Sequence, residues 1–195
     1  MARIGLKNFR YSKLDENEKV IAPNSLGKAI DCKVSLELNS AELYGDDALC
    51  ESDYTFNKGT VTITVDDDDD VILAPLLGHK ISEDGEIIRK DTDSAPYIAL
   101  GRIITKIVKG VYKYKVEFLS KVKFKDTMPD EKTKGESVEF QTTSIEGSVM
   151  RKKDGEWSKS KTFEDYKDAS DYLDSLLTAK EVTPASSYST KSTTK

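Results

Sequence analysis

Residues 111–124 read VYKYKVEFLSKVKF, the longest alternation of apolar and polar side chains in the chain. A period of two is typical of a β-strand with one buried face. At about 3.3 Å per residue this strand would be about 45 Å long, so we expect it to project beyond the sheet or to turn within it. The predicted apolar face consists of Tyr112, Tyr114, Val116, Phe118, Val122 and Phe124. The opposite face consists of Lys113, Lys115, Glu117, Lys121 and Lys123.

Further segments repeat this alternation on both sides of the long strand. The patterns IDCKVSLEL at 30–38 and TVTITV at 60–65 place apolar residues at every second position. The β-branched segment 98–108 also predicts a strand, and Gly101 within it marks a bulge or bend. Further strand patterns lie at 85–90, 138–145, 148–151 and 156–162. The sum predicts a mainly β protein, an antiparallel β-sandwich or barrel-like fold with long loops.

Helical patterns are confined to two segments. The first, 71–77, follows a run of aspartates and is limited by Pro75 and Gly78. The second, about 163–177, reads FEDYKDASDYLDSLL and repeats apolar residues at steps of three or four. We expect this amphipathic helix to flank one face of the sheet.

The two ends of the chain differ from its middle. Residues 1–29 show no clear periodicity, although they contain Phe9 and Tyr11, and we expect an N-terminal arm that orders against a partner, or an irregular loop. Residues 179–195 are rich in Ser, Thr and Lys, which predicts a disordered tail. One domain at 30–178 would then contain the sandwich and the C-terminal helix.

Composition limits the class of protein. The chain has 195 residues, 37% hydrophobic and 33% charged, with a net charge of -5, which fits one soluble domain. The longest apolar run, at 71–77, is far shorter than the roughly 18–20 residues that span a bilayer. The opening MARIGLKNFRY lacks the apolar centre of a secretory signal. We expect no membrane association and a reducing compartment.

Catalytic motifs are absent from the sequence. It contains no GxSxG, GxGxxG, GxxxxGK[ST] or HExxH string. Two cysteines, Cys32 and Cys50, and one histidine, His79, cannot supply the four ligands of a structural zinc site. Cys32 lies on the apolar side of its segment, which favours a small buried hydrophobe, and His79 has no recognisable nucleophile beside it. We expect neither enzyme activity nor a cofactor.

Five consecutive aspartates, at 66–70, are the most conspicuous local feature. Asp66, Asp68 and Asp70 are candidate ligands for a hard divalent cation. An EF-hand loop is excluded, because Val71 stands where that loop needs glycine and Leu77 where it needs glutamate. The sequence favours the alternative, a solvated turn that caps the following helix.

Charge is segregated along the chain. Residues 42–70 hold ten acidic side chains and one lysine, and residues 109–125 hold six lysines and one glutamate. Two solvated surfaces of opposite sign would explain this pattern. The alternative is that copies associate head to tail, with the acidic segment of one on the lysine face of the next. A dedicated DNA-binding face is a third interpretation, weakened by the acidic net charge.

Several segments together resemble the major tail proteins of long-tailed, non-contractile bacteriophages of Gram-positive hosts. The resemblance lies in IGLKNFRYSKL at 4–14, ELYGDDALCESDYTFNKGTVTITVDD at 42–67, LLGHK at 76–80 and APYIALG at 95–101. It covers about residues 1–175 in order and at plausible spacing, and it does not include the C-terminal tail.

The resemblance implies a structural virion protein of the phage tail, made and assembled in the bacterial cytoplasm. Such subunits form hexameric rings that stack into a tube, together with tape-measure, tail terminator and distal tail proteins. DNA passes without specific binding, because a duplex carrying one negative charge per about 1.7 Å does not adhere to an acidic wall.

The resemblance also implies roles for charged residues. The acidic residues would face the lumen or the neighbouring ring: Glu42, Asp46, Asp47, Glu51 and Asp53. The basic residues would contact a neighbouring subunit or form the outer wall: Lys113, Lys115, Lys121 and Lys123.

Two other classes of protein remain open. One is the related tube of a contractile injection machine, which requires a sheath protein. The other is a monomeric β-sandwich module that binds carbohydrate or protein. Such modules display an exposed aromatic platform, whereas Trp157 lies in a lysine-rich hairpin.

Overall fold

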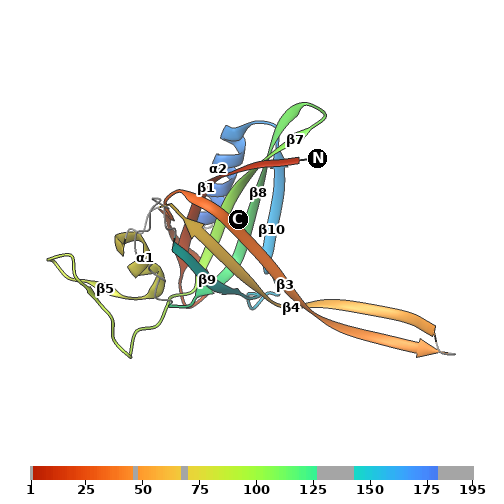
Figure 1. Cartoon of the computed structure of the whole chain (residues 1–195), viewed down its shortest axis with the longest axis horizontal. Helices are drawn as coiled ribbons and strands as arrows, with labels where there is room; N and C mark the ends of the chain where they lie inside the picture. Colours follow the sequence, from red (N-terminus) through yellow and green to blue (C-terminus); the bar gives the residue numbers. More distant parts are fainter. Residues whose placement is uncertain (1, 46–47, 67–69, 127–142, 180–195) are drawn as a thin grey trace, which may run out of the picture.

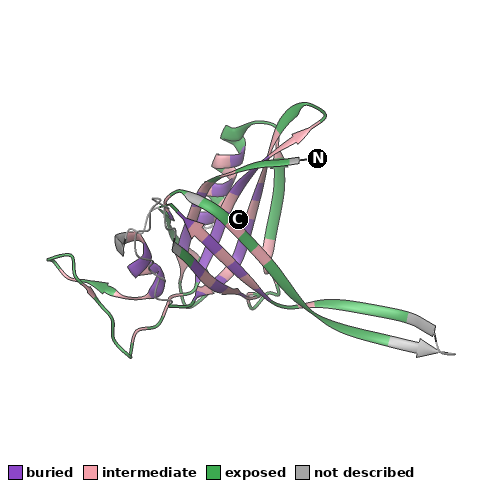
Figure 2. Cartoon of the chain, in the orientation of Figure 1, coloured by how far each residue is buried: buried purple, intermediate pink, exposed green. Residues whose placement is uncertain are grey.

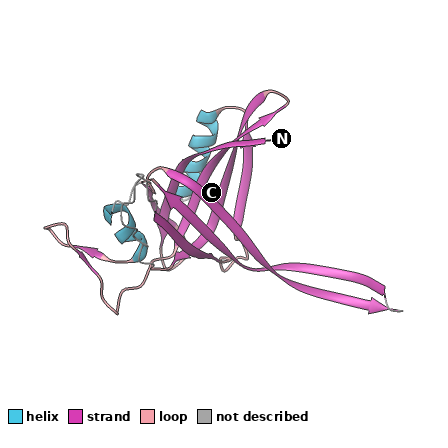
Figure 3. Ribbon diagram, in the orientation of Figure 1, coloured by secondary structure: helices cyan, strands magenta, loops and turns pink. Residues whose placement is uncertain are grey.

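The structure is a computed structural model that describes the chain except residues 1, 46–47, 67–69, 127–142 and 180–195. Strands dominate it, as Figure 3 shows. The elements in chain order are β1 (Ala2–Leu14), β2 (Val20–Ser25), β3 (Ala29–Gly45), β4 (Ala48–Val65), α1 (Asp70–Leu77), β5 (Lys80–Ile81), β6 (Ile87–Ile88), β7 (Ile98–Val108), β8 (Val111–Phe124), β9 (Thr143–Val149), β10 (Ser158–Phe163) and α2 (Tyr166–Leu177). The prediction of a mainly β protein with a flanking helix is confirmed.

Most strands belong to one antiparallel sheet of eight strands. Their order is β2-β1-β7-β8-β9-β4-β3, and β10 pairs with β8 outside this path. β5 and β6 form a small separate ladder. Figure 1 shows β3 and β4 crossing over β7 and β8, so that the sheet folds over itself into two layers, as in a β-sandwich.

The long strand β8 belongs to both layers, because it changes partner along its length. Its residues 114–119 pair with β10, and its residues 122–124 pair with β9. Between these parts β8 holds one extra residue, since Ile98 of β7 lies opposite Val122 whereas Leu100 lies opposite Leu119. Such a β-bulge reverses the face on which the following side chains lie. β8 is therefore one continuous strand with a bulge, whereas the sequence predicted that it would project beyond the sheet or turn within it.

The bulge divides the apolar residues of β8 between two hydrophobic clusters. Val116 and Phe118 pack under α2, together with the fully buried Leu173. Val122 and Phe124 instead pack in the main core between the layers. Figure 2 shows buried residues along the strands of the body. The prediction of one continuous apolar face from 112 to 124 is therefore wrong.

The helices cover different parts of the sheet. α2 packs mainly on β8, β7 and β2 and also contacts β1 and β10. It starts three residues later than expected because Phe163 ends β10, and it buries Ala169, Leu173 and Leu177. α1 adds Leu73, Leu76 and Leu77 to the main core. Its bounds agree within one residue with the predicted helix at 71–77.

The N-terminal segment is part of the sheet and is not an arm. β1 pairs with both β7 and β2, and Phe9, Tyr11 and Leu26 are buried in the main core. The alternation was hidden because the register of β1 shifts twice against β7, and Asn8, with a φ of 52°, lies within the second shift. The expected arm at 1–29 is corrected to two strands.

Other expectations are resolved only in part. The pattern at 85–90 is shortened to β6, and the predicted strands 138–145 and 148–151 overlap one strand, β9. Residues 138–142 and most of the expected loop at 125–136 lie outside the described residues, as does the expected tail from residue 180 onward.

Gly78 ends α1 in a conformation that a side chain would obstruct. Its φ is +87°, and the His79 amide donates to the Ala74 carbonyl at 2.9 Å, which closes the last turn. A Cβ at this position would overlap the backbone carbonyl of Ser94. Gly78 therefore allows the 78–95 segment to pass close to the end of α1.

Substitution of Gly78 tests this close approach. Gly78→Ala should lower the free energy of unfolding by about 3 kcal/mol, from left-handed strain and overlap with Ser94. Gly85→Ala is the control, because Gly85 has a φ of +84° but open space around its Cβ position, and it should cost only about 1 kcal/mol. Urea unfolding measures both, and equal losses would contradict the role given to Ser94.

Candidate interaction surface

β3 and β4 continue beyond the body as a two-stranded hairpin, visible at the right of Figure 1. β4 pairs with β9 only from Gly59 to Val65. Beyond that point, among the described residues, β3 and β4 pair only with each other, from Glu37 opposite Lys58 to Gly45 opposite Ala48. We call residues 37–58 the projecting hairpin.

The projecting hairpin and its base expose large apolar side chains. Leu38 is 52% exposed and Tyr54 is 57% exposed, and Leu36 beside the base is 45% exposed. The body supports the hairpin near its base, where Phe56 stacks on Trp157 with ring centroids 4.5 Å apart. An isolated two-stranded hairpin is marginally stable in water, so contact with another surface would stabilise this one. Exposed apolar side chains that lie together on such a hairpin are typical of an interaction site.

The predicted acidic loop is a regular part of this hairpin. Glu42 lies opposite Ser52, whereas Asp53 and Glu51 lie opposite Ala41 and Leu43. Residues two apart on a strand share a face, so Glu51 and Asp53 lie on one face and Glu42 on the other.

The other two predicted acidic residues, Asp46 and Asp47, lie outside the described residues. The expected acidic loop is corrected to two paired strands, which the structure describes up to Gly45 and from Ala48 onward.

The predicted basic residues of β8 do not share one face. Lys113 binds Glu164 at 3.1 Å, and Lys115 binds Glu117 at 2.6 Å, both before the bulge. After the bulge the face reverses, so the two later lysines lie on a different side of the strand. The four-lysine face predicted from alternation is therefore wrong.

The later lysines attach β8 to neighbouring loops. Lys121 binds Glu18 at 2.6 Å and lies 4.4 Å from the ring centroid of Tyr97. Lys123 lies 5.3 Å from the same ring centroid and donates to Ser94 at 3.1 Å. Each of these lysines therefore has an intramolecular partner.

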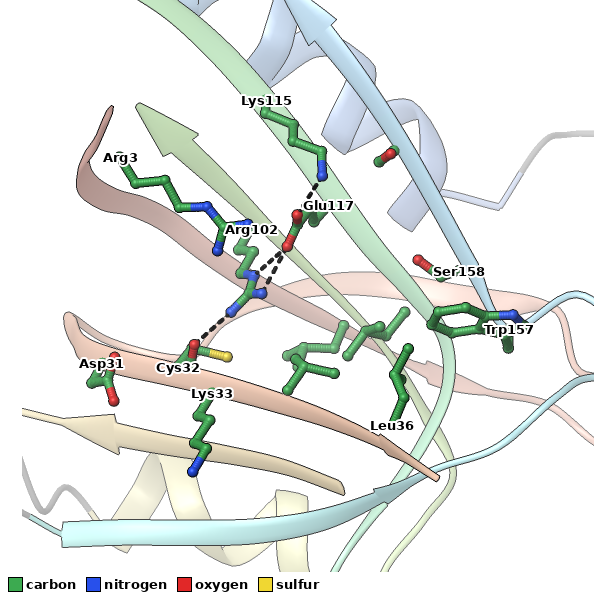
Figure 4. A pocket seen from close by; sticks show the side chains of 14 residues that line it. Arg3, Asp31, Cys32, Lys33, Leu36, Arg102, Lys115, Glu117, Trp157 and Ser158 are labelled. Atoms are coloured by element: carbon green, nitrogen blue, oxygen red, sulfur yellow. Dashed lines mark hydrogen bonds and ion pairs between the residues drawn. The ribbon is translucent and has the colours of Figure 1, made fainter. Parts of the chain in front are cut away.

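A cavity of about 740 Å³ opens between β3 and the strands β7, β8 and β10. Figure 4 shows Arg102 and Glu117 pointing toward one another inside it. Arg102 donates to Glu117 at 3.1 and 2.7 Å and to the Cys32 carbonyl at 3.0 Å, while Lys115 donates to the other carboxylate oxygen at 2.6 Å. Arg102 thus connects β7 and β8 to β3, across the two layers.

The cavity changes the ionisation of two groups. Burial raises the pKa of Glu117, but hydrogen bonds from Lys115 and Arg102 outweigh it and hold the pKa below its usual 4.5. Burial raises the pKa of the Cys32 thiol to about 11. A half-buried, protonated thiol agrees with the predicted apolar role of Cys32.

His79 joins two acidic side chains. Its ring nitrogens lie 3.0 Å from Asp93 and 3.1 Å from Asp126, and its side chain is 5% exposed. The hydrogen bond from His79 lowers the pKa of Asp93. These contacts attach the segment after α1 to the end of β8.

The aspartate run forms no described metal site. Asp66 lies 3.6 Å from Lys28, Asp70 begins α1, and Asp68 lies outside the described residues. Among the residues that the structure describes, no group of three or more His, Cys, Asp or Glu is arranged to hold a metal ion. Within the same ranges, no helix is long and apolar enough to cross a lipid bilayer.

Sequence reasoning missed Arg102 and the cavity around it. Arg102 stands inside an apolar segment, and its partner Glu117 was grouped with lysines. An isolated charge within a buried strand was the available signal, because such a charge needs a partner.

In comparisons with known proteins, no family model matches the chain and no curated protein is significantly similar to it.

The Arg102–Glu117 pair predicts a pH-dependent stability. Since the folded pKa of Glu117 is lowered, its contribution is fully present above about pH 4.5 and is lost as the pH falls further. Glu117→Gln should cost about 1.5–3 kcal/mol at pH 7 and flatten the acid limb of the stability curve.

Thermal unfolding between pH 3 and pH 7 measures both effects. The control is Glu37→Gln, since Glu37 lies 3.3 Å from Lys58 with 56% of its side chain exposed and should cost less than about 0.5 kcal/mol. Similar losses for the two variants would show that the cavity pair stabilises the fold no more than an exposed ion pair does.

Proposed function

We propose that this chain is the major tail tube subunit of a long-tailed, non-contractile bacteriophage, a structural protein of the virion tail. In this role it associates into rings that stack into a tube for the passage of DNA. The sequence resemblance supports this proposal, and the antiparallel two-layer sheet with one flanking helix has the architecture expected from it.

The observation that carries the proposal is the projecting hairpin. On the β3 side it extends from the body by residues 37–45, about 30 Å at the usual strand rise. Exposed Leu38 and Tyr54 lose water contact only when another chain covers them, because the body lies at the hairpin's base. A contact between such an extension and a different surface of the next copy is heterologous, and repeated heterologous contacts generate rings or open filaments.

Charge supports the same assignment. Glu51 and Asp53 are exposed, and the segment 42–53 contains five acidic residues and no basic one. An acidic surface toward the lumen would let DNA slide without adhering. The same acidic surface on a neighbouring ring would instead guide subunits into register.

The two alternative functions differ in the molecule that would bind to the chain. A tube of a contractile machine would bind a sheath protein along its outer wall. A monomeric binding module would retain a ligand, for which the cavity beside Trp157 offers space. The stacking of Trp157 on Phe56 favours a supporting role for this side chain over a free aromatic platform.

Electron microscopy tests the proposal directly. Negatively stained wild-type protein, held concentrated for days, should form rings or tubes with an open centre. Replacing residues 40–54 with an Asn-Gly turn should leave a folded monomer and abolish these assemblies, because Asn39 and Thr55 are already paired and a two-residue turn can join them.

The matched control deletes residues 180–195, a comparable number of residues at the C-terminal end of the sequence. This variant should keep assembling, since the resemblance to tail tube subunits does not include that segment. Assembly by the hairpin-deleted variant, or wild-type protein that remains monomeric and retains a sugar or peptide, would contradict the proposal.

A further inference from the structure

Three cations lie side by side on one row of the sheet. Arg3 of β1 pairs with Lys106 of β7, and Lys106 pairs with Lys113 of β8. Paired residues of antiparallel strands lie on the same face, with Cβ atoms about 4.5–5.5 Å apart. We call Arg3, Lys106 and Lys113 the cationic row.

Within the described residues the cationic row is only partly neutralised. Lys113 has Glu164 as its partner, whereas Arg3 and Lys106 form no ion pair among the described residues. Burial, followed by the charges of Lys115 and Arg3, lowers the pKa of Lys106. Because like charges placed directly opposite destabilise a sheet, an anionic group bound to the row would relieve this repulsion.

The acidic face of the projecting hairpin has the charge and spacing to bind this row. Glu51 and Asp53 are exposed, lie on one face, and form no ion pair within the described chain. Residues two apart on a strand are separated by about 6.6 Å, so the two carboxylates can reach neighbouring cations of the row.

The contact requires a second copy of the chain. Figure 1 shows the N-terminus and the β7–β8 turn at the opposite end of the body from the point where the hairpin leaves it. A paired hairpin does not fold back over that distance while its ladder stays intact.

We propose that the cationic row is the acceptor for the acidic hairpin face, Glu51 and Asp53, of the next copy. This inference rests on the proposed function and names the surfaces that join one subunit to another. The contact is heterologous and directional, so each copy keeps one free hairpin and one free row for further growth.

Charge reversal with mixing tests this contact. Arg3→Glu with Lys106→Glu should weaken self-association about 10- to 100-fold at low salt, and Glu51→Lys with Asp53→Lys should do the same. Mixing the two variants in equal amounts should restore association, because each variant then meets an acceptor of opposite charge. Sedimentation velocity measures association, and circular dichroism verifies that each variant is folded.

The control is Lys80→Glu with Arg89→Glu, which changes the net charge by the same amount at two exposed positions, one in β5 and one directly after β6. This variant should associate like the wild type.

Three outcomes would overturn the inference. Undiminished association of the row variant, or no rescue on mixing, would refute the acceptor site while leaving self-assembly intact. Loss of duplex DNA binding in the row variant, with association unchanged, would assign the row to nucleic acid. A wild-type chain that stays monomeric at all salt concentrations would refute both this inference and the proposed function.

Discussion

The fold depends on one constraint: a single strand, β8, pairs with β10 in one layer and with β9 in the other. The bulge between these parts allows β8 to pair with both strands. Within the bulge, the hydroxyl and the amide of Ser120 have hydrogen-bond partners. The buried Ser120 donates its hydroxyl to Glu156 at 2.6 Å and its amide to the Trp157 carbonyl at 2.9 Å. Without the reversal of faces at this point, Val122 and Phe124 would leave the main core, and β9 would no longer position β4 and the projecting hairpin.

Much of this fold is predictable from local patterns. The segments 30–38 and 60–65 alternate without interruption, the segment 98–108 is apolar and β-branched, and α2 has a clear apolar periodicity, so the sequence predicts the type of these elements correctly. The prediction failed where the backbone departs from a period of two. The register shifts of β1 hid a buried strand. The bulge of β8 placed the apolar residues predicted to share one face, from 112 to 124, on two different faces of the sheet. Local sequence cannot show such shifts, because they are set by the partner strand.

The two candidate interaction surfaces also differ in whether the sequence alone predicts them. The acidic character of the hairpin was readable because its residues are close in sequence. The cationic row was not, since Arg3, Lys106 and Lys113 come from three strands and only pairing brings them together. The two surfaces lie at different ends of the body, which gives the chain a direction. Surfaces of opposite charge at different ends would let each copy bind the next in one direction only.

The central claim is that another copy of the chain covers the projecting hairpin. Hydrogen exchange of residues 37–58, measured by mass spectrometry in dilute and in concentrated protein, tests it most directly. Exchange should be fast in the dilute chain, where none of the described strands pairs with the hairpin as a third strand, and should slow markedly on assembly while β7 and β8 stay protected throughout. Equal exchange of the hairpin at both concentrations, in protein that has assembled, would contradict the account.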